Sequence, residues 1–202
     1  NKPNLVVCGA SLRIPNTTFT ISGTSVACAV MTGTIALLFE KYPYLVGKPG
    51  LTMAILNASC VYFPTYTSRD ANGYHDQTGA GNFLYDRFCQ AYPTFSAITT
   101  PASESNAQIL NRQVVMSAGQ TIKVAYFSIV NATGDKDETR FSDIDMRIMY
   151  NGQMVVHRTS TIDNVEVIEY TATSSGLHEI QLQKYLSEAG IEEDVYLAYY
   201  LS

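Results

Sequence analysis

Small and hydroxylated residues precede the most apolar stretch of the sequence. Ser22-Gly23-Thr24-Ser25 leads into residues 25–41, SVACAVMTGTIALLFEK, which carry no charge before Glu40 and predict a buried helix that ends at Tyr42-Pro43. The first N–H groups of a helix have no intrahelical acceptor and lie at the positive end of the helix dipole. They can therefore hold an oxyanion beside a serine hydroxyl. A plain N-cap role for Ser22 or Thr24 is the alternative.

Three segments in order resemble the catalytic domain of subtilisin-like serine peptidases (subtilases). Gly23-Thr24-Ser25-Val26-Ala27 resembles the motif of the active-site serine, and Lys2–Gly9 resembles the Lys-Pro segment upstream of it. Gly79-Ala80-Gly81-Asn82, with Ala91, resembles the Gly-x-Gly turn and the closing segment. After the serine the family usually has Met-Ala-Ser-Pro-His, and here the sequence is Val-Ala-Cys-Ala-Val; Cys8 also replaces a turn proline. These departures affect helix packing and the turn rather than the nucleophile.

The resemblance implies that Ser25 is the nucleophile, with its own backbone N–H as one oxyanion donor, and that Thr24 contributes to substrate binding. A serine nucleophile needs a histidine base oriented by a carboxylate, and in the subtilisin order both precede the serine. All three histidines, His75, His157 and His178, follow Ser25. A local set of His75 with Asp70 and Asp76 does not fit the family geometry, and the bland interpretation is a solvated loop. The chain thus holds one third of a triad.

The resemblance also implies a partner, because in subtilases the serine helix packs on a parallel sheet built mostly from upstream sequence. Without that sheet, Val30, Leu37 and Leu38 would form an exposed apolar face. We therefore expect the N-terminal part of the same catalytic domain as partner, with a homodimer as the fallback. The parent would be a secreted or cell-surface endopeptidase that hydrolyses polypeptides, and this chain alone would be inactive. A pseudo-peptidase, or a cell-surface module whose β-sandwich binds protein or carbohydrate, is the competing hypothesis.

The second half of the sequence has a different pattern. Residues 93–108, rich in Ser, Thr and Pro, predict a linker after a catalytic part at 1–92. Apolar residues then alternate with polar ones over 109–202, which predicts an all-β sandwich or jelly roll. Within it one predicted buried face is shared by Ile144, Met146 and Ile148, a second by Val195 and Leu197, and a third by His178, Ile180 and Leu182, with Glu179, Gln181 and Lys184 near the polar side. The expected fold class is α/β followed by all-β.

Composition excludes some classes of function. With 13 Lys+Arg against 18 Asp+Glu, the formal net charge of −5 argues against nucleic-acid binding. No apolar run in the sequence approaches the ~18 residues that a membrane-spanning helix requires. Cys8 and Cys28 are interpreted as small buried residues, no disulfide is predicted, and no zinc motif is present. No cofactor is certain, but calcium is a hypothesis for a set of oxygen ligands that the strand alternation more readily explains as solvent-facing: Asp143, Asp145, Asp163, Asn164 and Glu166.

Overall fold

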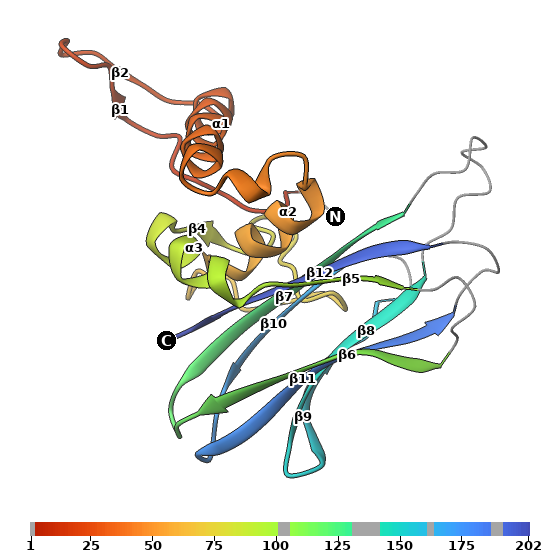
Figure 1. The fold of residues 1–202 in the computed structure, drawn as a ribbon. Helices are drawn as coiled ribbons and strands as arrows, with labels where there is room; N and C mark the ends of the chain where they lie inside the picture. The colour runs from red at the N-terminus through yellow and green to blue at the C-terminus, as the bar shows by residue number, and fades with distance from the viewer. Residues whose placement is uncertain (1–2, 101–105, 131–141, 161–163, 187–191) are drawn as a thin grey trace.

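Two four-stranded sheets lie face to face in the second half of the chain, in a computed structural model that describes residues 3–100, 106–130, 142–160, 164–186 and 192–202 (Figure 1). One sheet has the strand order β10-β7-β12-β5 and the other β6-β11-β8-β9, all antiparallel. The predicted β-sandwich is confirmed. The strands are β5 (Ser96–Thr100), β6 (Ala107–Met116), β7 (Thr121–Val130), β8 (Asp143–Tyr150), β9 (Gln153–Arg158), β10 (Val165–Thr171), β11 (Gly176–Leu186) and β12 (Glu193–Leu201).

Alternating side chains fill the space between the two sheets. Ile144, Met146 and Ile148 of β8 are fully buried there, and so are Val195 and Leu197 of β12. Successive side chains of a strand point to opposite faces, so a period-two apolar pattern places every second residue in the core. The predicted inward faces of β8 and β12 are confirmed.

In strand β11 one charged residue, Lys184, lies on the opposite side from the one expected. His178, Ile180 and Leu182 are buried as predicted. Lys184 was expected near the polar side, but it is fully buried, and its Nζ donates a hydrogen bond to Thr100 Oγ1 at 3.2 Å. Lys184 follows the strand alternation, which places it on the same face as Leu182, and not the preference of an ammonium group for water.

The predicted linker is also partly wrong. Residues 96–100 form β5, which pairs with β12 in the register Ile98↔Val195, and β6 already begins at Ala107. Ile98 packs against the sandwich core. A segment rich in Ser and Thr has the composition of a connection, but Thr and Ile also favour strands, and here a sheet edge was available for pairing.

The apolar helix predicted from the sequence is present as α1 (Thr24–Lys41), with Tyr42 as its C-cap residue. It is not buried, contrary to the prediction. Leu38 alone among its residues is buried, whereas Leu37 is 60% exposed and Val30 is exposed as well. Leu38, expected in the exposed face, instead joins the core formed with Leu45.

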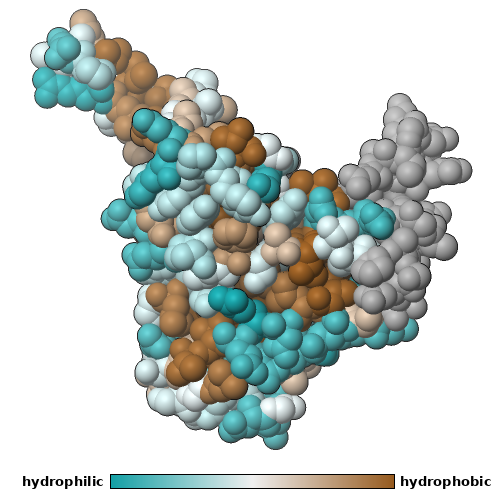
Figure 2. Space-filling view, in the orientation of Figure 1, coloured by the Kyte–Doolittle hydropathy of each residue, from teal (hydrophilic) through white to brown (hydrophobic). Residues whose placement is uncertain are grey.

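Helix α1 forms an arm together with the hairpin of β1 (Leu12–Arg13) and β2 (Thr20–Ile21), and the arm extends away from the sandwich (Figure 1). Hydrophobic residues continue along the arm in the space-filling view (Figure 2). Phe19 at the hairpin is 71% exposed. Cys8 and Cys28 are exposed on this part of the molecule too, so their interpretation as buried residues is wrong. All four cysteines are unpaired.

By length and composition α1 also qualifies as a membrane span, with 18 residues of which 6% are buried. Thr32 and Thr34 interrupt the apolar residues of α1, so no such run was expected from the sequence. Their hydroxyls, however, donate to the carbonyls of Cys28 and Val30 within the helix, at 2.9 Å each. Core helices of globular proteins pass the same test, so one such helix does not assign a membrane location.

The remaining helices pack on the sheet that contains β7 and β12. They are a 3-10 helix at Pro43–Leu45, α2 (Pro49–Ala58), α3 (Tyr85–Ala91) and a 3-10 helix at Tyr92–Thr94, with β3 (Cys60–Val61) and β4 (Asn82–Phe83) as a small separate sheet. Helix α2 approaches the sheet closely, because a Cβ added at Gly50 would lie 2.7 Å from the ring of Tyr196. The helical part therefore covers the outer face of one sheet.

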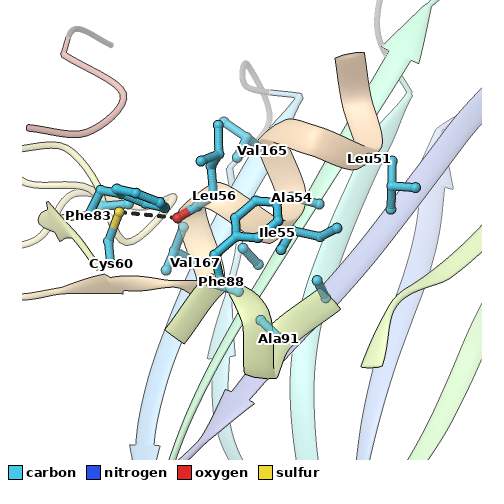
Figure 3. Packing of buried hydrophobic residues seen from close by; sticks show 14 of the residues in the cluster. Leu51, Ala54, Ile55, Leu56, Cys60, Phe83, Phe88, Ala91, Val165 and Val167 are labelled. Atoms are coloured by element: carbon cyan, nitrogen blue, oxygen red, sulfur yellow. Dashed lines mark hydrogen bonds between the residues drawn. The ribbon is translucent and has the colours of Figure 1, made fainter. Parts of the chain in front are cut away.

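One hydrophobic core, separate from the core between the two sheets, contains residues of both the helical part and the sandwich. Figure 3 shows Ile55, Leu56 and Phe88 close to Val165 and Val167 of β10, and the core also includes Leu51 of α2 and Ala125 and Ala198 from the same sheet. The described strand pairs are antiparallel, apart from a parallel bridge between Val6 and Asn82. The parallel sheet of the expected α/β domain is not among the described residues.

Candidate functional site

Ser25 lies in the first turn of α1, where the helix has no side-chain cap. Its N-cap residue is Gly23, and the first helical hydrogen bond runs from Ala27 N to Gly23 O at 3.1 Å. The N–H groups before Ala27 therefore have no intrahelical acceptor. The first turn contains no acidic residue that would occupy them. The hydroxyl of Ser22 is used elsewhere, as it accepts a hydrogen bond from Ser11 N at 2.8 Å.

Glycine leaves space on the approach to this serine. A Cβ added at Gly23 would lie 3.4 Å from Ser25 Oγ. Both Ser25 and the neighbouring Thr24 are exposed. A reacting group can therefore reach the Ser25 hydroxyl and the free N–H groups of the first turn from the same side. This arrangement suits nucleophilic attack with oxyanion stabilisation.

The upstream Lys-Pro segment meets the serine helix at Gly9. Gly23 N donates to Gly9 O at 2.7 Å. A Cβ added at Gly9 would come within 2.7 Å of both Ala27 Cβ and Gly23 O. Gly9 is thus the point at which the chain passes directly against the start of α1.

The same segment pairs with the Gly-Ala-Gly turn at its other end. Ala80 N donates to Asn4 O at 2.8 Å, and Val6 N donates to Gly81 O at 2.9 Å. A Cβ at Gly79, whose φ is +58°, would lie 2.3 Å from the carbonyl oxygen of Asn4. Residues 3–9 therefore connect two segments that are more than fifty residues apart in the sequence, the Gly-Ala-Gly turn and the serine helix.

Replacing Gly9 with alanine should destabilise the protein by roughly 1–3 kcal/mol, because the new methyl group meets backbone and a neighbouring Cβ that cannot easily move. Gly33→Ala is the matched control within α1. A Cβ there meets nothing within 4 Å, and better helix propensity should stabilise the protein by up to about 1 kcal/mol. Urea unfolding measures both. Equal effects of the two substitutions would contradict the Gly9 contact.

The structure does not bring a histidine to Ser25 among the described residues. His75 was interpreted as part of a solvated loop, but its side chain is buried, packs at a tilt against Tyr66 with ring centroids 4.8 Å apart, and accepts a hydrogen bond from Gln77 N through Nδ1. His157 lies on β9, and His178 is buried in β11. The local set of His75 with Asp70 and Asp76 therefore stays apart from the serine.

Two of the oxygen ligands considered for calcium, Glu166 and Asn164, form hydrogen bonds within the protein, whereas Asp143 Oδ1 is buried without a hydrogen-bond partner among the described residues. Glu166, expected to face solvent or a metal, is fully buried, and its two carboxyl oxygens accept hydrogen bonds from Met146 N and Ser160 N at 2.7 and 2.8 Å. The Asn164 amide donates to Ser128 O. Asp163 lies outside the described residues. Within the described part of the chain no three His, Cys, Asp or Glu side chains are grouped to hold a metal ion.

Burial raises the pKa of Glu166 to about 9, and the two backbone N–H donors only partly oppose this. The folded protein therefore binds a proton that the unfolded chain releases near pH 4.5, so the contribution of Glu166 to stability is fully present below that pH and is lost as the pH rises towards 9. One such proton contributes up to about 1.4 kcal/mol per pH unit. Urea unfolding between these limits should give a flatter pH profile for Glu166→Gln than for the wild type. Parallel profiles would contradict a protonated Glu166.

Two adjoining cavities lie at the junction of the helical part and the sandwich, and the sequence did not predict them. They measure about 360 and 180 Å³ and share Tyr62 and Glu169 in their walls. Their cationic residues come from four separate places in the chain, Arg69, Arg87, Lys123 and Arg158. No sequence motif joins these residues, so only the fold could reveal that they lie together.

No family model matches the sequence, and no curated protein matches it. Three solved structures resemble the chain over 54% of its length. The PliG protein of Aeromonas hydrophila, a periplasmic inhibitor of g-type lysozyme, is 14% identical over 87% of its own length, with a TM-score of 0.34. A CBM4 structure is 12% identical over 71%, with a TM-score of 0.38, and the C-terminal domain of the sugar-binding protein EclA is 14% identical over 79%, with a TM-score of 0.33. These distant similarities assign the chain to no family.

Proposed function

We propose that this chain carries the nucleophile of a subtilisin-like serine endopeptidase, with Ser25 as the catalytic residue. One observation carries the proposal: of the three segments that resemble the subtilase motifs, the Lys-Pro segment is hydrogen-bonded to both of the others, to Gly23 through Gly9 and to the Gly-Ala-Gly turn through Asn4 and Val6. An uncapped helix N-terminus at the serine adds support, since a plain N-cap role for Ser22 or Thr24 would place a side-chain hydrogen bond there.

In the proposed reaction, Ser25 Oγ attacks the carbonyl carbon of a peptide bond and forms the C–O bond of a tetrahedral intermediate. The serine proton passes to a histidine base, and the Ser25 N–H donates to the developing oxyanion. The histidine then gives its proton to the leaving amine as the C–N bond breaks. Water releases the acyl group by the same route. Thr24, exposed beside Ser25, contributes to holding the substrate backbone.

The histidine, its orienting Asp and the side-chain oxyanion donor belong to upstream sequence in this proposal. Its partner is the N-terminal part of the same catalytic domain, which would cover the exposed apolar side of α1, including Leu37 and Val30. A secreted or cell-surface location goes with the resemblance to subtilases. Polypeptides are the proposed substrates.

Native and denaturing mass measurements on the purified protein, followed by fluorophosphonate labelling, test the proposal. We expect a second polypeptide with the missing Asp and His, and labelling on Ser25 in the assembled species, because the probe reacts only with an activated serine. A homodimer would point to self-association through the arm. An assembled protein with both upstream residues that is not labelled would refute a peptidase and favour a pseudo-peptidase.

A further inference from the structure

The two adjoining cavities that share Tyr62 and Glu169, here called the junction cleft, contain more cationic side chains than carboxylates. The cavity of about 360 Å³ is lined by Arg69 and Arg158, and Glu169 is the one carboxylate among the described residues that line it. That carboxylate already lies 3.9 Å from Lys123 Nζ, in the adjoining cavity. Among the described residues, neither arginine forms an ion pair with a carboxylate. The protein as a whole is acidic, with a net charge of −5, so this cleft is a local reversal of sign.

The guanidinium groups keep donors for a ligand. Arg69 donates to the carbonyls of Tyr66 and Ser68 through Nη1, at 2.5 and 2.6 Å; its guanidinium carbon lies 3.8 Å from the centre of the Tyr62 ring, and the group also interacts with the Tyr62 hydroxyl. Among the described residues Arg158 makes one long hydrogen bond, 3.4 Å from Nη1 to His157 O, and its Nε is buried without an acceptor, so the outer Nη groups are the donors that a ligand would meet. Planar guanidinium groups bind carboxylates, sulfates and phosphates through paired N–H donors.

Lys123, the cation that lines the smaller cavity, is almost completely removed from solvent. Lys123 is 1% exposed, donates to Ala80 O at 2.6 Å and lies 3.3 Å from the centre of the Tyr62 ring. Burial, together with the nearby Arg69 and Arg87, lowers the pKa of Lys123 to about 8. A buried cation beside further cations is costly unless an anion comes close.

The walls between the charges are aromatic. Tyr62, Phe63 and Tyr66 line the larger cavity, and the Phe63 and Tyr66 rings meet edge to face with centroids 5.9 Å apart. A flat apolar surface can stack there while its charged end meets the guanidinium groups. We propose that this cleft binds an oxyanion group, a carboxylate, sulfate or phosphate, carried on a ligand with a flat apolar face, between Arg69 and Arg158. The site does not involve Ser25, so this proposal is independent of the proposed peptidase activity.

Calorimetric titration of the whole chain with three matched aromatic probes tests this site. Benzoate and phenyl phosphate carry the anion, and benzyl alcohol has the ring without the charge. We expect either anion to bind at millimolar concentration, at least about tenfold more tightly than benzyl alcohol and more weakly as salt is added. The tighter of the two anions identifies the oxyanion that the cleft prefers.

Variants assign the binding to the cleft. Arg69→Gln and Arg158→Gln should each weaken binding by about tenfold or more, because each removes a charge-assisted pair of donors. Arg13→Gln is the matched control, since Arg13 lies on the hairpin arm and donates to Thr17 O. Arg158→Lys keeps the charge if Arg158→Gln proves unstable, and should bind more tightly than Arg158→Gln. Equal binding of benzyl alcohol and the anions, unchanged affinity in both cleft variants, or no binding of either anion would overturn the proposal.

Discussion

Under the proposed mechanism, Ser25→Ala is expected to lower kcat of the assembled protein by roughly 10⁴-fold or more and to abolish fluorophosphonate labelling. The reason is that in this proposal the Oγ atom forms the covalent bond to the acyl group, and no other side chain at the start of α1 is proposed to replace it. KM should change little, because the helix N-terminus and Thr24 remain in place. Hydrolysis of a peptide substrate by the chain assembled with its upstream part measures both constants.

Ser22→Ala is the matched control for that substitution. Ser22 lies three residues before Ser25, is exposed as well, and its hydroxyl accepts the Ser11 N–H. Losing this one exposed hydrogen bond should cost about 1 kcal/mol of stability and leave kcat within a few-fold of the wild type. If both variants lose activity equally, the loss reflects a damaged turn, and if neither does, Ser25 is not the nucleophile.

Local patterns were enough to predict the sandwich strands and α1. The alternation of Ile144, Met146 and Ile148 survives in β8 because a strand buried on one side must place every second residue in the core. The position of α1 followed from its apolar run and from Pro43. These features depend on neighbours in the sequence, which is why they could be inferred from it.

Burial depended on distant parts of the chain and was predicted less well. Glu166 can be buried because Met146 N and Ser160 N donate hydrogen bonds to its carboxyl oxygens. Nothing in the sequence around Glu166 indicates those partners. The exposure of α1 has the opposite cause, since none of the described elements covers most of its surface. The helical part was expected to be separate from the sandwich, whereas α2 packs directly on the sheet through Gly50.

The shared core leads to the second large prediction, on Phe88. Its side chain is fully buried between the rings of Tyr42 and Phe83, each with centroids 6.2 Å away, in the core that includes Val165 and Val167 of the sandwich (Figure 3). Phe88→Ala should lower the free energy of unfolding by about 3–5 kcal/mol, because it removes apolar contacts and leaves a cavity. The free energy of unfolding of a native domain is only about 5–15 kcal/mol, so this loss is a large part of the total stability.

The form of the transition is as informative as its midpoint. Because one core joins α2 and α3 to the sheet of β7, β10 and β12, the helical part and the sandwich should unfold together, and Phe88→Ala should move a single transition. Far-ultraviolet circular dichroism follows the backbone and near-ultraviolet dichroism follows the tyrosines, since the chain has no tryptophan. Phe19→Ala is the control, as Phe19 is 71% exposed and its loss should change stability by no more than about 0.5 kcal/mol. Two separate transitions, with the sandwich unaffected by Phe88→Ala, would mean that residues 1–92 and the sandwich are independent units and that the contacts between them contribute little to stability.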